Sequence, residues 1–171
     1  ERFERMLKKD EAYFFDVDEF EALSDYYHGI GKNKKALKAV ELATEQHPNI
    51  PSLLVKKARY LTATNKLKEA QKEIKELEAI IPDSFDLYMA RATFYSHKSN
   101  HRKAIELYKK ALTKAEFPDD VWPLIAVEYQ FIGEYDLAAK YLQLNLDVNP
   151  DDEMALYNIA LCFDLMNNSK K

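Results

Sequence analysis

A step of 34 residues recurs along the chain, and it limits the fold more than any other feature of the sequence. Two series of small residues keep this step: Ser24, Ala58, Ala92, Ala126 and Ala160, and Ala36, Ala70, Ala104 and Ala138. Two series of bulky residues keep it as well: Phe20, Leu54, Tyr88, Trp122 and Leu156, and Tyr27, Leu61, Tyr95, Tyr129 and Phe163. A fixed period of this length is typical of an array of stacked units, in which each unit buries apolar surface against its neighbours.

Each unit is predicted to be a helical hairpin. It contains two segments of helical length with apolar periodicity, separated near the middle by Gly31, Asn65, Ser99 or Gly133. With three glycines and six prolines in 171 residues, the chain has too few turn residues for a fold built of β-hairpins. The small residues let the helices of the array approach closely. The predicted fold class is therefore all-α, a solenoid of antiparallel helix hairpins.

The pattern resembles the tetratricopeptide repeat family, whose 34-residue unit carries W-x2-L-G-x2-Y, then A-x3-F-x2-A, then P. The fourth unit matches best, with Trp122, Ile125, Ala126, Tyr129, Gly133, Ala138, Leu142 and Pro150 in register. The departures are Lys57 and Arg91 at the family's leucine position, Pro118 two residues late, and Asn145 in place of a small residue. The resemblance is to bacterial multi-repeat members. It implies a right-handed α-α superhelix whose concave wall is lined by the first helix of each unit.

The repeat step also predicts how the chain is organised. Residues 1–16 are expected to be the tail of a preceding repeat or an N-terminal helix, residues 17–50, 51–84, 85–118 and 119–152 four full repeats, and residues 153–171 the first helix of a partial fifth repeat. Both ends are therefore expected to be cut from a longer array. Apolar surface at an end would then belong to a neighbouring repeat.

Charge and composition disfavour several classes of function. The chain has 25 basic and 29 acidic residues and a net charge of −4, so no attraction to nucleic acid or anionic lipid is expected from bulk charge. A basic run at residues 31–38 is a local exception. No apolar run approaches the roughly 18 residues that span a bilayer, so no membrane insertion is predicted. The single cysteine, Cys162, favours a cytoplasmic location and leaves a periplasmic one open.

No residue pattern predicts an enzyme, a cofactor or a metal site. His97 and His101 have the spacing of two metal ligands on one helix face, but they flank the predicted break between two helices. The acids between Asp16 and Glu21 suit the start of a helix, where negative charge is favourable. Cys162 lies among core-type residues and is interpreted as a small buried apolar side chain.

The predicted binding surface is the concave face formed by the first helices. Its residues are Asp25, Lys56, Arg59, Met89, Thr93, Leu124, Val127, Phe131 and Tyr157. The surface changes from acidic through basic to apolar, which suits a peptide or partner helix with a basic end and an apolar end. Some members of the family hold a terminal carboxylate at such positions, but Glu21 and Asp25 would repel one.

The predicted function is a noncatalytic scaffold that binds a protein or peptide partner in this concave groove. Two alternatives stay open at this point. In one, the chain is a structural segment that self-associates through the exposed ends of the array. In the other, it is a regulatory domain of a larger enzyme or signalling protein.

Overall fold

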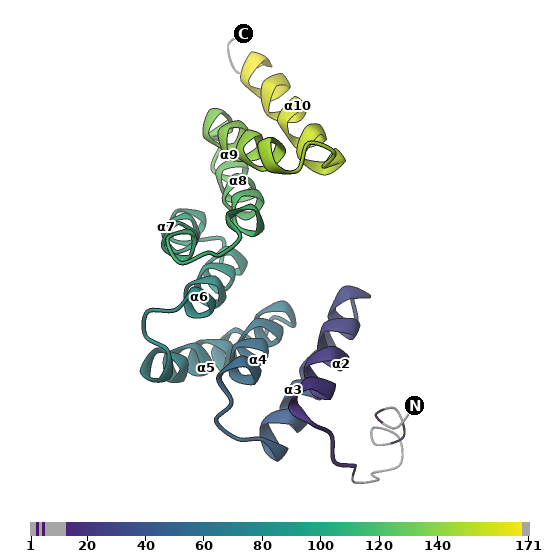
Figure 1. Ribbon diagram of the computed structural model, residues 1–171. Coiled ribbons are helices and arrows are strands. Elements are labelled where there is room, and N and C mark those ends of the chain that lie inside the picture. The colour runs from purple at the N-terminus through teal and green to yellow at the C-terminus, as the bar shows by residue number, and fades with distance from the viewer. Residues whose placement is uncertain (1–2, 4, 6–12, 169–171) are drawn as a thin grey trace. The chain divides into compact units, whose positions relative to one another are not determined.

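A computed structural model describes residues 3, 5 and 13–168 of the chain. Within these residues the secondary structure comprises nine α-helices and a short 3-10 helix, with no strand. The helices are α2 (Val17–Gly29), α3 (Asn33–Gln46), α4 (Pro51–Ala63), α5 (Leu67–Ile80), α6 (Phe85–His97), α7 (His101–Leu112), η1 (Pro118–Asp120), α8 (Trp122–Phe131), α9 (Tyr135–Val148) and α10 (Glu153–Asn168), as Figure 1 shows. The all-α prediction is confirmed. The repeat boundaries themselves stay a prediction.

The turns between paired helices share one backbone geometry. The four predicted break residues have positive φ angles: 72° at Gly31, 61° at Asn65, 56° at Ser99 and 78° at Gly133. After each of them, the next N–H donates to a carbonyl five residues earlier, as from Lys32 to Tyr27 at 2.8 Å. This Schellman arrangement satisfies carbonyls that the end of a helix leaves without partners. Glycine adopts a positive φ at no steric cost, which explains Gly31 and Gly133.

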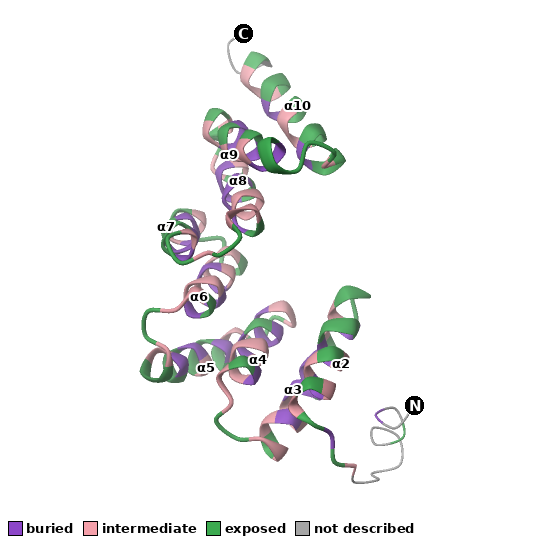
Figure 2. Cartoon of the chain, viewed as in Figure 1, coloured by how far each residue is buried: buried purple, intermediate pink, exposed green. Residues whose placement is uncertain are grey.

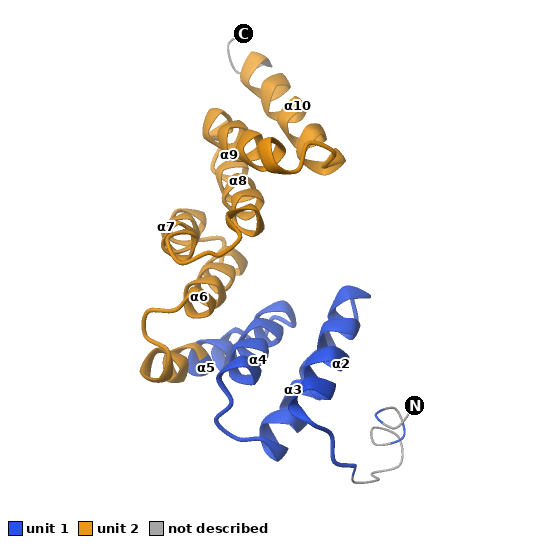
Figure 3. Cartoon of the chain, viewed as in Figure 1, with its two compact units in different colours: residues 1–73 blue, residues 74–171 orange. Residues whose placement is uncertain are grey.

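The chain divides into two compact units, residues 1–73 and residues 74–171, with the boundary inside α5 (Figure 3). In the first unit, α3 contacts both α2 and α4. In the second unit, α6 pairs with α7, α7 contacts α8, and α9 packs between α8 and α10. Each unit is thus built from antiparallel neighbours that are close in sequence.

The small residues lie where the helices meet. Ser24, Ala58, Ala92 and Ala126 are fully buried, and so are the residues of the second series, Ala36, Ala70, Ala104 and Ala138. Figure 2 shows the buried residues along the faces that the helices turn toward one another. Ala160 is the exception, because the face of α10 on which it lies is exposed in the described structure. The close-approach interpretation of both series is confirmed.

Three departures from the family pattern have specific polar partners. Lys57 Nζ lies 2.6 Å from Glu73 Oε1, and Arg91 Nη1 lies 2.9 Å from Glu78 Oε1, so each replaces an apolar contact with an ion pair to α5. Buried Asn145 donates from Nδ2 to Asp152 Oδ2 at 2.7 Å. The other oxygen of Asp152 accepts from the Ala155 N–H at 3.0 Å, at the start of α10. These exchanges keep the helices together with charge and hydrogen bonds where leucine or alanine is usual.

The connection between α7 and α8 differs from the others. After Leu112 the chain makes a turn, and the late proline, Pro118, begins the 3-10 helix η1. Val121 is fully buried directly after η1, which anchors the start of α8. As a result α7 has 12 residues and α8 has 10.

The N-terminal prediction falls mostly on residues 1–2, 4 and 6–12, which lie outside the described residues. Of the residues before α2 that are described, Phe3 is buried, and its ring lies 5.7 Å from that of Tyr27 and 6.4 Å from that of Phe15. Apolar side chains ahead of α2 therefore cover the face on which Tyr27 lies.

Candidate protein-interaction surfaces

Five residues occupy equivalent positions at 34-residue steps on the first helices: Asp25, Arg59, Thr93, Val127 and Leu161. Four of them were predicted to line the binding surface, and Leu161 extends the series onto α10. The first two lie in the first unit and the other three in the second. Because the two units are separate compact bodies, the predicted surface is described as two surfaces, one on each unit.

On the first unit, Asp25 and Lys56 are paired with each other. Lys56 Nζ lies 2.6 Å from Oδ1 and 2.7 Å from Oδ2 of Asp25, and the Tyr60 hydroxyl donates to Oδ1 at 2.9 Å. Arg59 is exposed and makes no ion pair with a described residue. Asp25 and Lys56 were predicted to form an acidic and a basic part of the surface. In the structure they and Tyr60 form one hydrogen-bonded cluster that joins α2 to α4.

The pKa values in this cluster follow from its contacts. Partial burial alone would raise the pKa of Asp25, but the hydrogen bonds from Lys56 and Tyr60 and the charges of Lys56 and Arg59 bring it below its ordinary value. Burial raises the pKa of Tyr60 to about 12, and the neighbouring Asp25 carboxylate contributes to the rise. Asp25 is therefore ionised and Tyr60 is a neutral donor at neutral pH.

On the second unit, most of the residues predicted to bind a partner are apolar. Met89, Thr93 and Leu124 are half-buried, whereas Val127 is 40% exposed, Phe131 67% and Tyr157 66%. Helices α8 and α10 touch each other, since Gln130 Nε2 lies 3.3 Å from the buried Sγ of Cys162. We refer to Met89, Thr93, Leu124, Val127, Phe131 and Tyr157 as the apolar face of the second unit.

Sequence reasoning missed a polar pair that contacts Phe131 of the apolar face. His101 Nδ1 lies 2.7 Å from Glu128 Oε2, and the Glu128 side chain is 4% exposed. The ring of Phe131 stacks on the His101 imidazole with centroids 4.7 Å apart and an angle of 12°. The repeat step could have revealed this pair. The positions equivalent to Glu128 in other repeats hold Tyr60, Phe94 and Cys162, which are all buried. A carboxylate at an otherwise aromatic or apolar position needs a buried partner.

The histidines are not gathered into a metal site in the described residues. His97 Nδ1 lies 3.1 Å from the backbone oxygen of Thr93, whereas His101 faces Glu128. Nowhere in the described part of the chain do three His, Cys, Asp or Glu side chains lie close enough to share a metal ion. The buried Cys162 has the environment predicted for it.

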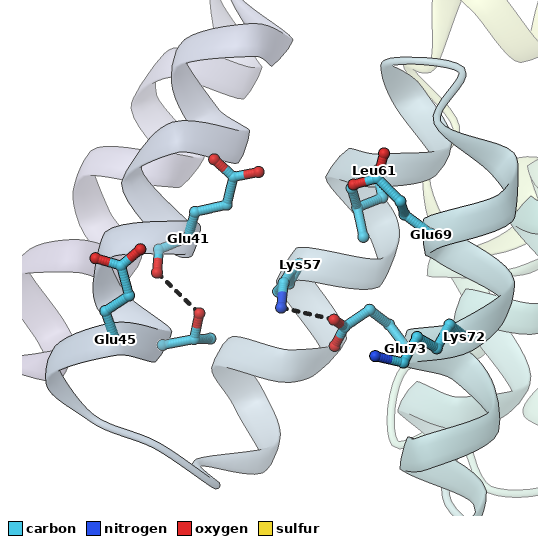
Figure 4. A pocket seen from close by; sticks show the side chains of 8 residues that line it. Glu41, Glu45, Lys57, Leu61, Glu69, Lys72 and Glu73 are labelled. Carbon is cyan, nitrogen blue, oxygen red and sulfur yellow. Dashed lines mark hydrogen bonds and ion pairs between the residues drawn. The ribbon is translucent and has the colours of Figure 1, made fainter.

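A pocket of about 350 Å³ lies on the first unit between α3, α4 and α5 (Figure 4). Its lining includes four carboxylates, Glu41, Glu45, Glu69 and Glu73, together with Lys57 and Lys72. Three of the four carboxylates have cationic neighbours: Lys57 pairs with Glu73, and Lys66 lies 3.8 Å from Glu41 and 3.7 Å from Glu69. This pocket is a compensated charge network between helices.

The fold defines a class of protein, the helical-repeat proteins. A family model described as tetratricopeptide repeat matches residues 85–113, which span α6 and α7. The chain has the fold of tetratricopeptide-type repeat proteins. Proteins of this family are generally noncatalytic scaffolds for protein–protein interactions, and their stacked repeats create extended binding surfaces.

Solved structures have the same fold. A thermophilic TPR protein of Thermus thermophilus matches with a TM-score of 0.75 and 18% identity over 94% of this chain and 87% of that one. The pilF protein of Pseudomonas aeruginosa matches with a TM-score of 0.71 and 15% identity over 90% of this chain and 68% of that one.

A sequence relative with a curated name is the human protein O-mannosyl-transferase TMTC1, 25% identical over 142 residues. The match covers 81% of this chain but 16% of the human protein, so the chain spans about a sixth of that relative's length. A match of this extent does not make the chain a transferase. In the described residues, no helix has the length and apolar character that a bilayer-spanning segment needs.

Proposed function

We propose that the apolar face of the second unit binds an apolar segment of a protein partner, as a peptide or as one side of an amphipathic helix. The observation that carries this proposal is the exposure of Val127, Phe131 and Tyr157 on helices that touch each other. Large exposed apolar side chains that lie together are typical of binding sites, whereas single exposed ones are common on any surface. The chain thus acts as a noncatalytic scaffold.

Phe131 is the proposed anchor of this surface. Its ring is held by the His101 imidazole, which in turn is held by Glu128, so the ring is oriented before a partner arrives. An aromatic side chain that is exposed yet fixed loses little conformational freedom on binding, which favours affinity. Met89 and Leu124 provide half-buried apolar surface beside more exposed side chains, and Met adapts to partners of different shape.

The test is a selection of displayed peptides against the chain, followed by binding measurements with the variants Phe131→Ser and Val127→Ser. The matched control is Phe117→Ser, because Phe117 is 60% exposed but lies outside the apolar face. We expect selected peptides to carry apolar side chains and to bind both Phe131→Ser and Val127→Ser at least tenfold more weakly, with Phe117→Ser unchanged. Peptides that bind all four proteins equally would refute the proposal.

A second candidate function, self-association, has an observation of its own. Three side chains on α10 are exposed: Leu156, Ala160 and Phe163. The residues of α8 that are equivalent to Ala160 and Phe163 are Ala126 and Tyr129, and both are buried against α9. This exposed side of α10 is suited to a helix that packs as α9 packs on α8. Sedimentation velocity over a hundredfold range of concentration tests it, since Phe163→Ser should abolish a dimer that Phe131→Ser leaves intact. A constant monomer mass would remove this candidate.

A further inference from the structure

A second pocket of the first unit differs in chemical character from the pocket between α3, α4 and α5. It has a volume of about 560 Å³ and is lined by residues 31–35, at the start of α3, and residues 63–65, at the end of α4. These residues belong to two turns and to the helix ends beside them, so none of them is among the residues predicted to bind a partner.

The space in this pocket results from small residues and from the turn geometry. Gly31 has a positive φ, and a Cβ atom built on it would have no neighbour within 4 Å. Ala63 adds only a methyl group. The Thr64 hydroxyl donates to the Tyr60 carbonyl at 2.8 Å, so its hydrogen is used inside α4. The pocket therefore offers room and a largely apolar wall.

Its rim carries a concentration of positive charge. Lys32 and Lys34 line the pocket and are both exposed, and Lys38 is exposed one helical turn after Lys34. In the described structure none of these three makes an ion pair. Lys35 also lines the pocket, with its ammonium group 5.3 Å from the centre of the Tyr27 ring.

The repeat provides an internal comparison for this charge. In α7 the residue equivalent to Lys35 is Lys103, and it lies 2.7 Å from Glu106, one turn further along the helix. In α3 the residue equivalent to Glu106 is Lys38. A second lysine therefore stands in α3 where α7 has the acid that pairs with its lysine. Positive charge in the first turn of a helix also opposes the helix dipole. Stability therefore does not explain this group of lysines.

We propose that this basic pocket binds an acidic segment of a protein partner. One carboxylate side chain enters between residues 31–35 and 63–65, and neighbouring acids pair with Lys32, Lys34 and Lys38. An acidic protein segment is favoured over nucleic acid because the pocket lining has no aromatic side chain on which a base could stack and no arginine, and because the chain as a whole has a net charge of −4. The inference does not depend on the proposed function of the second unit.

The probe is a fluorescein-labelled peptide of twelve residues composed of Glu, Asp and Ala, and its binding is followed by fluorescence anisotropy at low and moderate salt. A peptide with Gln and Asn in place of the acids and a single-stranded oligonucleotide of equal charge are the comparison ligands. We expect the acidic peptide to bind, the amide peptide not to bind, and the oligonucleotide to bind more weakly. Tighter binding of the oligonucleotide would overturn the proposal.

Two kinds of variant locate the binding. Lys32→Glu with Lys34→Glu should weaken binding of the acidic peptide at least tenfold. The matched control, Lys75→Glu with Lys140→Glu, changes the net charge equally at two exposed lysines elsewhere and should change the affinity less than twofold. Ala63→Phe fills the pocket without altering charge and should also weaken binding at least tenfold. Equal loss in the two charge variants, or full binding by a folded Ala63→Phe protein, would show diffuse attraction and refute the pocket.

Discussion

The half-buried imidazole of His101 and the buried carboxylate of Glu128 form a pair, with Nδ1 and Oε2 2.7 Å apart, that ties the first turn of α7 to α8. The two helices belong to successive predicted repeats, so the pair stabilises a junction between repeats. The same pair supports the Phe131 ring on the apolar face.

Glu128→Ala should destabilise the chain by about 1–3 kcal/mol, because it leaves the half-buried His101 without its partner. The check is urea unfolding followed by circular dichroism. Glu134→Ala is the control, since Glu134 is exposed and its side chain makes no capping hydrogen bond. Combining Glu128→Leu with His101→Phe should recover most of the loss, because apolar side chains at both positions need no hydrogen bond. A Glu128→Ala protein as stable as the control would contradict the role of the pair.

Acid should weaken the first unit through Asp25. The pKa of Asp25 in the folded chain lies below its ordinary value, so the carboxylate adds stability above about pH 4, the value expected in the unfolded chain. That stability is lost as the pH falls through the lower folded pKa. Because the Asp25 side chain is 55% exposed, the effect should stay below about 1 kcal/mol.

The measurement for Asp25 is the unfolding midpoint of the wild type and of Asp25→Asn between pH 7 and pH 3. The wild type should be the more stable protein at pH 7, and the difference should shrink toward pH 3. A difference that stays constant over this range would show that the ion pair with Lys56 does not stabilise the fold.

The fold could be predicted from the sequence because it depends on backbone geometry and residue size. Gly31 and Gly133 mark turns that need a positive φ, and the alanine series marks close helix contacts. Both features repeat with the same step, and both are visible in a single sequence.

The pairings within the surfaces could not be predicted in the same way. Whether Lys56 faces solvent or reaches Asp25 depends on side-chain rotamers and on the register of α4 against α2, which the repeat step does not specify. The sequence therefore assigned Asp25 and Lys56 to the predicted surface but did not show that these two residues neutralise each other. The pair of Glu128 and His101 could have been predicted only from a departure from the repeat, namely a carboxylate at a position that is aromatic or apolar in the other repeats.

Ala92→Leu and Ala104→Leu should each destabilise the chain by about 1–3 kcal/mol, because both residues are fully buried where helices approach closely. The control is Ala160→Leu, at the position of α10 equivalent to Ala92, which is exposed. It should change the free energy of unfolding by less than about 0.5 kcal/mol. Thermal melts of the three variants decide the matter, and equal effects at Ala92 and Ala160 would contradict the register of the repeats.

Ser99→Gly should stabilise the second unit. Ser99 has a φ of 56°, a left-handed conformation that costs a residue with a Cβ atom roughly 1–2 kcal/mol and glycine almost nothing. Since glycine also has more freedom in the unfolded chain, the expected net gain is about 0.5–1 kcal/mol. Ser96→Gly is the matched control: Ser96 lies inside α6, where glycine should destabilise the helix by about 0.5–1 kcal/mol. Opposite shifts of the unfolding midpoint would confirm the turn geometry, whereas a loss of stability in both variants would contradict it.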